Sequence, residues 1–131
     1  PQNGTAPPSP NTVPTPQAAV ESQLQAWRSA WQRKDLKAYL AFYADNFRPP
    51  RGLTRAAWQD ERRQRLAGEQ RLEIAVEQLQ TTPLPDAQVR TLFLQRFRAG
   101  DFIDTSNKEL VWQKFGDRWL IIQERQLFEL R

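Results

Sequence analysis

Residues 53–77 have the sequence LTRAAWQDERRQRLAGEQRLEIAVE, in which two periodicities follow one another. The first part has helical spacing: Thr54 can cap a helix, and Leu53 and Trp58 lie at the spacing of a hydrophobic staple. Gly68 can adopt the left-handed conformation that ends a helix. After Gly68, apolar residues alternate with charged or small ones, which is typical of a half-buried strand. The stretch therefore predicts a helix followed by a strand.

Two more helices are predicted upstream. Apolar residues recur at helical spacing over residues 20–31, which predicts a first helix that runs to about Lys34. Asp35 can cap a second, short helix that ends near Ala44. Residues 47–52 contain two prolines and a glycine, so we expect an irregular crossing there before the third helix begins.

Three more strands are predicted downstream. Pro83 and Pro85 are expected to end the first strand. Residues 89–97 carry apolar side chains on both faces, so this strand is predicted to be central and covered on both sides. Hairpin turns are expected at residues 99–101 and 116–117, and the last strand at residues 119–128. The order is three helices and then four antiparallel strands, an α+β fold with no parallel crossover.

The N-terminal segment has a composition of its own. Six of the ten prolines lie within residues 1–16, which carry no charge and almost no large apolar side chain. Such a segment cannot bury enough surface to offset the entropy of ordering it, about 1–2 kcal/mol per residue. We therefore expect residues 1–17 to be a disordered, proline-rich tether and residues 18–131 to be one domain. Because the chain begins without methionine, we expect it to follow an upstream domain of a longer protein.

The composition restricts the classes of function. The net charge of +4, carried mainly by arginine, is compatible with polyanionic partners but does not choose among them. The absence of cysteine excludes disulfides and thiolate chemistry, and without histidine only scattered carboxylates remain, so no metal or other cofactor is expected. Because the aromatic residues lie on apolar faces rather than among the basic ones, nucleic acid is not an expected partner. No apolar run approaches the roughly 20 residues of a membrane span, so membrane insertion is not expected.

Two runs of residues carry a resemblance to a known family. The first consists of Trp27, Ala30, Trp31, Lys34, Asp35, Tyr39, Leu40, Phe42, Tyr43, Phe47, Arg48, Pro49, Gly52, Arg55, Trp58, Arg62 and Arg65. The second consists of Arg118, Trp119, Leu120, Ile121 and Glu124. With three helices followed by an antiparallel sheet, the chain resembles the nuclear transport factor 2-like (NTF2-like) superfamily, which includes SnoaL-type polyketide cyclases and ketosteroid isomerases. The resemblance spans residues 20–124 and is greatest to the domain found at the C-terminal end of bacterial L,D-transpeptidase-like, L,D-carboxypeptidase-like and tetratricopeptide-repeat envelope proteins.

The resemblance implies a fold, a role and a location. The fold is three N-terminal helices packed on a curved, four-stranded antiparallel sheet that forms a cone. The role is that of a non-catalytic accessory domain in the bacterial periplasm or cell envelope, where its partners are peptidoglycan or another cell-wall glycan, a protein, or the upstream domain of the same chain. Homodimers that form through the outer face of the sheet are common in the superfamily, so a homodimer is a further expectation.

Enzymes of the superfamily use a carboxylate, histidine or tyrosine in a dry pocket, where burial raises the pKa of a carboxyl group. In this chain the candidates for that role are Tyr43, Asp45, Asp104, Glu109 and Glu124. Glu124 follows Ile122 by two positions, so it points into the core if Ile122 does, and it then needs a partner such as Arg48 or Arg96. The two interpretations of Glu124 are a structural ion pair and a ligand-binding group.

Two further groups of residues are candidates for binding. The pocket of the cone is predicted to be lined by Trp31, Tyr43, Gln95, Trp112 and Glu124, although large aromatic residues at such spacing often belong to the core. A basic surface on and before the third helix is predicted from Arg48, Arg55, Arg62 and Arg65, and its alternative is a solvated face neutralised by acidic neighbours. The preferred function is a binding domain, and the alternative is a small isomerase, cyclase or hydrolase that uses a buried carboxylate and Tyr43.

Overall fold

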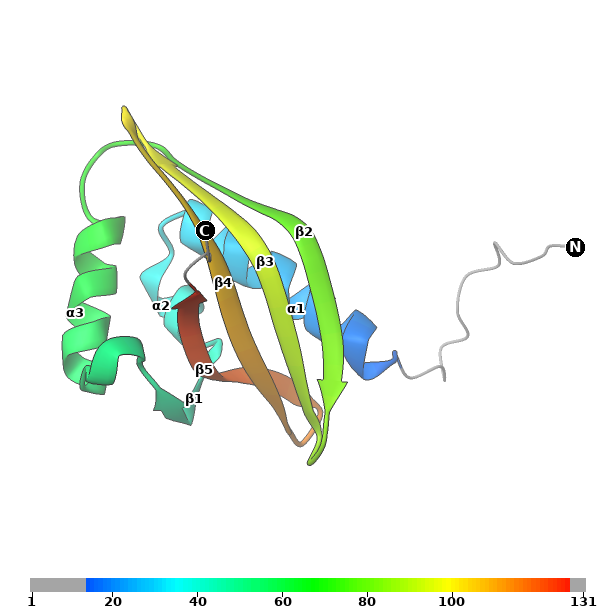
Figure 1. Cartoon of the computed structure of the whole chain (residues 1–131). Helices are drawn as coiled ribbons and strands as arrows, with labels where there is room; N and C mark the ends of the chain where they lie inside the picture. Colours follow the sequence, from blue (N-terminus) through cyan, green and yellow to red (C-terminus); the bar gives the residue numbers. More distant parts are fainter. Residues whose placement is uncertain (1–13, 128–131) are drawn as a thin grey trace, which may run out of the picture.

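The computed structural model describes residues 14–127 and shows a curved sheet with helices against one side (Figure 1). The helices are α1 (Pro16–Gln32), α2 (Leu36–Leu40) and α3 (Arg55–Leu66), with a short 3₁₀ helix η1 (Pro50–Gly52) before α3. The strands are β1 (Tyr43–Arg48), β2 (Leu72–Leu84), β3 (Gln88–Ala99), β4 (Phe102–Phe115) and β5 (Arg118–Leu127). The strand order in the sheet is β1-β5-β4-β3-β2.

The sheet of the described residues has five strands, so the prediction of four was wrong. The additional strand, β1, pairs in parallel with β5, where Tyr43 lies opposite Ile121 and Arg48 opposite Gln123. The predicted second helix was too long for the same reason: α2 ends at Leu40, and the backbone oxygen of Phe42 accepts a hydrogen bond of 2.8 Å from the amide of Ile121. Only the edge of β5, which is far away in the sequence, makes this short segment a strand.

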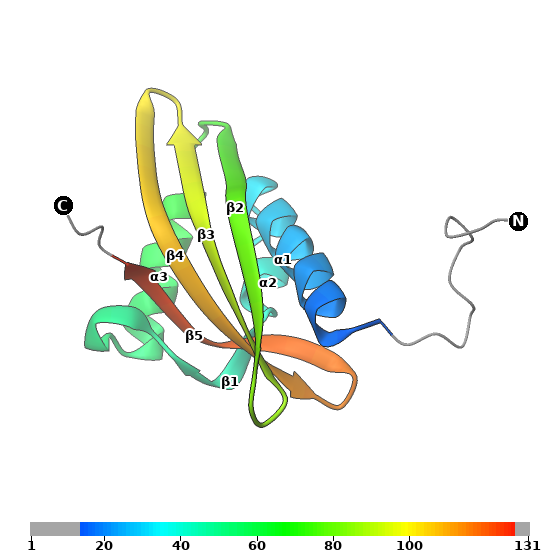
Figure 2. The same cartoon turned by 45° about the vertical axis from the view of Figure 1, so that its right-hand side comes forward.

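The remaining strands form an antiparallel meander (Figure 2). Both predicted hairpin turns are present, with Gly100 at φ 62° and Gly116 at φ 65°. β2 continues through Pro83 instead of ending there, because β2 is an edge strand and the missing proline N–H leaves no neighbour unpaired. β3 lies inside the sheet as predicted, but only one of its faces is fully buried, since Leu92 and Leu94 on the other face are only half-buried.

The helix boundaries follow the capping residues. The Oγ1 atom of Thr54 accepts from the amide of Ala57 at 3.1 Å at the start of α3, and Oδ1 of Asp35 accepts from the amide of Ala38 at 3.1 Å at the start of α2. α1 begins at Pro16 with Thr15 as its cap, so the helix includes the last two residues of the predicted tether. Residues 1–13 of that tether lie outside the described residues. No helix of residues 14–127 is long and apolar enough to span a membrane.

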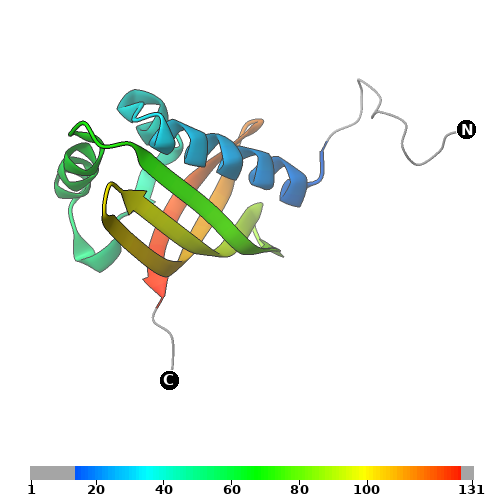
Figure 3. The same ribbon diagram turned by 90° about the horizontal axis from the view of Figure 1, so that it is seen from above.

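An aromatic core fills the space between the helices and the inner face of the sheet. α1 lies along this face, which is seen from above in Figure 3. Its buried residues Trp27 and Trp31 meet edge to face at 5.3 Å between ring centroids, and Tyr43 meets Trp58 of α3 at 4.5 Å. The indole Nε1 of Trp27 donates to the hydroxyl of Tyr43 at 2.9 Å. The interior of the predicted cone is therefore largely filled by side chains.

Candidate functional site

A pocket of about 740 Å³ lies at the mouth of the cone, between α3 and the inner face of β3, β4 and β5. Its helical side consists of Pro50, Arg51, Glu61, Arg62, Gln64 and Arg65. The sheet supplies Gln95, Asp104, Lys108, Glu124, Arg125 and Gln126. Eleven of these twelve residues have polar side chains, among them five cationic side chains and three carboxylates.

A buried ion cluster forms part of the pocket wall. Oε2 of Glu124 accepts from Nη2 of Arg62 at 2.5 Å and from Nζ of Lys108 at 2.8 Å, and Oε1 accepts from the hydroxyl of Tyr43 at 2.9 Å. The hydroxyls of Tyr43 and Tyr39 are hydrogen-bonded at 3.0 Å. All of these side chains are buried; Glu124 of β5 connects α3, β1 and β4, and the Tyr43 hydroxyl extends the cluster to α2.

Glu124 reaches the inner face because β5 contains a register shift. Ile121 lies opposite Trp112 and Gln123 lies opposite Val111, so Ile122 is an extra residue between them. Ile121 is fully buried, whereas Ile122 is only half buried. The regular alternation of side chains, which predicted that Glu124 and Ile122 lie on the same face of the sheet, is therefore interrupted here. Glu124 instead shares the inner face with Ile121, three positions away.

The charge state of the cluster follows from its neighbours. Burial by itself raises the pKa of Glu124, but the charges of Arg62 and Lys108, together with the hydrogen bonds from Lys108 and Tyr43, outweigh it and lower the pKa from 4.5 to about 2. Burial lowers the pKa of Lys108 in spite of the nearby carboxylate. For Arg62, burial acts to lower the pKa, and the Glu124 charge outweighs it, so the guanidinium stays protonated. Glu124 is thus firmly ionised at neutral pH.

The two tyrosines of the cluster stay protonated. Burial raises the pKa of Tyr39 to about 12 and raises that of Tyr43 well above its ordinary value, with the Glu124 charge acting in the same direction. Tyr43 therefore donates its proton to Glu124 in a stable hydrogen bond.

Several buried polar atoms have no hydrogen-bond partner within residues 14–127. Two belong to residues that line the pocket, Nε of Arg62 and Oε1 of Gln95. The others are the indole nitrogens Nε1 of Trp31 and Trp58. The Arg62 guanidinium lies 5.3 Å from the Trp58 ring centroid and 6.0 Å from that of Trp31, within the range of a cation–π contact. Since buried polar groups are normally paired, the two pocket atoms are candidates for contact with a ligand or water.

The predicted pocket residues divide into two groups. Gln95 and Glu124 line the pocket. Trp31, Tyr43 and Trp112 instead lie in the core, where Tyr43 contacts Glu124 and Nε1 of Trp112 donates to Oγ1 of Thr91 at 3.0 Å. Large aromatic side chains on the inner faces of elements that pack together are buried by their neighbours, which leaves the lining to the polar residues nearer the mouth.

The expected partners of Glu124 were wrong. Arg48 is exposed at the end of β1, and Nε of Arg96 donates to Glu77 at 2.9 Å on the outer side of the sheet. Arg62 takes the place of both because α3 turns this residue toward the sheet. The predicted basic surface is divided as a result: Arg62 is buried, and Arg65 lines the pocket.

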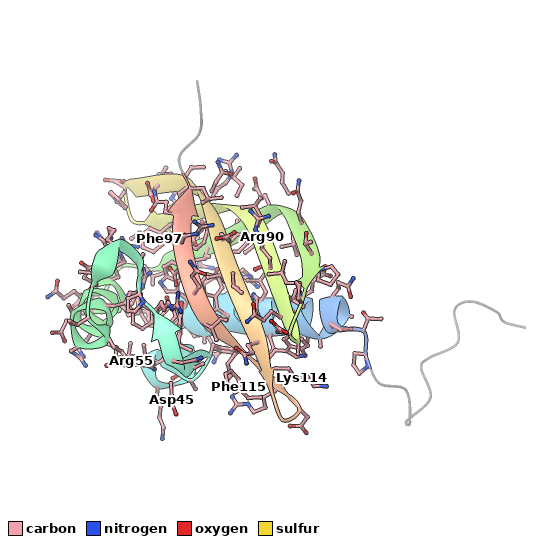
Figure 4. The ribbon with its side chains drawn as sticks, turned by 60° about the horizontal axis from the view of Figure 1, so that its bottom comes forward. Asp45, Arg55, Arg90, Phe97, Lys114 and Phe115 are labelled. Atoms are coloured by element: carbon pink, nitrogen blue, oxygen red, sulfur yellow. The ribbon has the colours of Figure 1, made fainter. Side chains whose placement is uncertain are left out.

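Arg55 and the other candidate carboxylates lie elsewhere. Nη1 of Arg55 donates to the backbone oxygen of Ala44 at 2.6 Å, near the exposed Asp45 of β1 (Figure 4). Glu109 is buried between Arg90 and Arg125, with Nε of Arg125 at 2.6 Å. Asp104 is the remaining candidate, and it lines the pocket.

Lys108 is a member of the site that the sequence reasoning missed. The signal was present, since Lys108, Leu110 and Trp112 alternate along β4 and all three are buried. A lysine on the apolar face of a strand is a candidate for a buried ion pair. No group of three or more acidic side chains within residues 14–127 is arranged to hold a metal ion.

The family of this domain follows from its sequence. The model of the Cds6 C-terminal NTF2-like domain matches residues 19–125. The chain belongs to this family. None of the curated proteins matches it in sequence. The NTF2-like fold predicted from the resemblance is thereby confirmed.

Solved structures with the NTF2-like fold resemble the domain. Bd1075 of Bdellovibrio bacteriovorus has a TM-score of 0.74 at 24% identity, over 82% of this chain and 40% of Bd1075. A variant of Pgp2, the helical cell shape determining protein of Campylobacter jejuni, has a TM-score of 0.76 at 16% identity, over 84% of this chain and 40% of Pgp2. An NTF2-like protein of unknown function from Pseudomonas putida has a TM-score of 0.70 at 16% identity, over 88% of this chain and 95% of that protein. This NTF2-like domain thus corresponds to less than half the length of Bd1075 and Pgp2.

Proposed function

We propose that this NTF2-like domain is a non-catalytic accessory domain that attaches a larger protein of the bacterial periplasm or cell envelope to a cell-wall glycan or a protein partner. Its family is defined by a C-terminal domain, and it matches about 40% of the length of Bd1075 and Pgp2, which is the relation expected of an accessory domain. Pgp2 determines helical cell shape, and this supports a role at the cell wall.

The low pKa of Glu124 and its three hydrogen-bond partners are the observation that supports a non-catalytic role. A general base is effective when its pKa lies near the working pH, and a carboxylate with a pKa of about 2 accepts protons poorly at neutral pH. Its oxygens are also occupied by Arg62, Lys108 and Tyr43. Glu124 has the contacts of a structural ion pair that also forms part of a pocket wall.

The alternative function, a small isomerase, cyclase or hydrolase, needs a dry pocket with a carboxyl group of raised pKa. The pKa of Glu124 is lowered rather than raised, and Tyr43 is enclosed in the core beside it. The aromatic residues that would enclose a reacting substrate fill the cone themselves. An open, polar pocket at the mouth fits recognition of a polar group better than chemistry in a dry cavity.

A sedimentation experiment tests the proposal. The 131-residue chain is mixed with purified insoluble peptidoglycan sacculi and, separately, used to capture partners from a detergent-free envelope extract, with an unrelated small basic protein as the control for charge. Saturable co-sedimentation, or a captured partner that binds again in purified form, is the expected result. A chain that does neither would contradict the proposal, and turnover of a small-molecule substrate would favour the enzyme.

A further inference from the structure

Residues that line the pocket carry hydrogen-bonding groups that the protein leaves unused. Among residues 14–127, Arg65 lines the pocket and forms no salt bridge, although eight other ion pairs are present. Nε of Arg62 and Oε1 of Gln95 are buried and unpaired, in residues that are 6% and 2% exposed. An unpaired buried polar atom destabilises a protein, so a ligand that satisfies both atoms recovers free energy on binding.

These groups lie close together in the fold. Arg62 and Arg65 are three residues apart on α3, and therefore on one side of that helix. The Arg65 guanidinium lies 5.9 Å from the Phe97 ring centroid. Phe97 and Gln95 are two residues apart on the inner face of β3, and Gln95 and Arg65 line the same pocket.

The chemistry of the three groups specifies what they bind. Arg65 and Nε of Arg62 are donors and require an acceptor, for which the planar guanidinium favours a carboxylate. Oε1 of Gln95 is an acceptor and requires an N–H or O–H group. A ligand that satisfies all three carries a carboxylate and a donor on neighbouring atoms. The free end of a peptide has this arrangement, because its carboxylate and its last N–H are attached to the same carbon.

The charges of the pocket favour a singly charged anion. Glu61 is paired with Arg51 at 2.8 Å, and Glu124 with Arg62 and Lys108, so the pairs inside the protein account for both of these carboxylates. Arg65 remains, with Asp104 also in the lining. A doubly charged phosphate on Arg65 would meet the Asp104 carboxylate and find only one guanidinium for its two charges, whereas one carboxylate matches one guanidinium.

We propose that the pocket binds the free carboxyl end of a short peptide, with Arg65 and Nε of Arg62 on the carboxylate and Oε1 of Gln95 on the adjacent N–H. This inference rests on the proposed function as a binding domain and names the chemical group that the pocket recognises. Two sources can supply the group: a cell-wall peptide, which ends in D-residues, and the C-terminus of a protein, which ends in an L-residue.

The test is an NMR titration of the ¹⁵N-labelled full chain, followed at the indole and backbone N–H signals. The probes are N-acetyl-D-alanyl-D-alanine, N-acetyl-L-alanyl-L-alanine and the C-terminal amide of each. We expect at least one acid to bind about tenfold more tightly than its amide, because a charge-assisted hydrogen bond is lost in the amide. The enantiomer that binds more tightly identifies the source. The inference is overturned if acid and amide bind equally or if neither acid binds.

Two matched variants locate the site. Arg65→Ala is expected to abolish the preference for acid over amide. Arg63→Ala, which removes an exposed arginine of the same helix that pairs with Asp60, is expected to keep it. An acid preference that survives Arg65→Ala overturns the assignment.

The sedimentation experiment separates the two proposals. If the chain binds sacculi or a partner but shows no preference for a free carboxylate, the inference about the ligand fails and the proposed function remains. If binding to sacculi and to partners is absent as well, both fail.

Discussion

Glu124 shows how one residue can organise a site without acting as its catalyst. A buried carboxylate is tolerated only with charged and hydrogen-bonding partners, and here it has two cations and a tyrosine hydroxyl. The same carboxylate keeps Arg62 and Lys108 in the interior, where neither would be stable alone. The cluster holds α3 against the sheet and thereby forms one wall of the pocket.

Replacing Glu124 by alanine should therefore strongly reduce the stability of the fold. The change leaves two cations buried without their anion, which typically costs about 3–5 kcal/mol of unfolding free energy. Glu61→Ala is the matched control, because its partner Arg51 is exposed and such pairs contribute about 1 kcal/mol or less. Urea denaturation of both variants gives the comparison. Equal losses of stability for the two variants would show that the Glu124 cluster is not a stabilising pair.

The pH dependence follows from the same residue. The pKa of Glu124 in the folded state, about 2, lies below its ordinary value of 4.5, so the ionised form favours folding. This contribution, about 3 kcal/mol, is complete above pH 4.5 and is lost as the pH falls toward 2. Carboxyl ¹³C NMR of Glu124 measures the titration directly. A midpoint at or above 4.5 would contradict the ion cluster.

At the scale of elements, local signals determined some boundaries and long-range pairing determined others. The caps Asp35 and Thr54 and the glycines of the two hairpins act within a few residues, so the helices and turns that depend on them were predictable. β1 has no such signal. Its six residues become a strand because β5 offers an unpaired edge, and that edge exists only after the meander has formed.

Trp58 tests the docking of α3. It is fully buried and contacts Tyr43 and Phe47 of β1, so Trp58→Ala should cost about 3–5 kcal/mol of unfolding free energy. Thr54→Ala, which removes only the cap of the same helix, should cost about 1 kcal/mol. Chemical denaturation followed by circular dichroism measures both. A loss below 1 kcal/mol for Trp58→Ala would contradict its place in the core.

At the scale of the whole molecule, one core joins the helices and the sheet. The hydrophobic cluster includes residues from α1, α2, α3 and all five strands. It contains every tryptophan of the chain, namely Trp27, Trp31, Trp58, Trp112 and Trp119. A single core of this kind gives no part of the domain an independent source of stability.

The domain should therefore unfold in one cooperative step. Tryptophan fluorescence reports the core, and far-ultraviolet circular dichroism reports the helices and the sheet, so the two transitions should coincide in urea. Separate midpoints would show that α1 or the β2–β3 hairpin unfolds independently of the rest.

The homodimer predicted from the resemblance stays a prediction, and sedimentation equilibrium at several protein concentrations tests it.

The sequence by itself determined the α+β class, the three helices, the meander and the family, because periodicity, caps and turns act between residues that are close in the chain. The tertiary structure alone decided the parallel strand β1, the register shift that turns Glu124 inward, and the pairing of Glu124 with Arg62 and Lys108. Arg62 and Glu124 lie 62 positions apart, and only packing brings them together. A pocket lined by such residues forms only when the sheet curves and α3 packs against it.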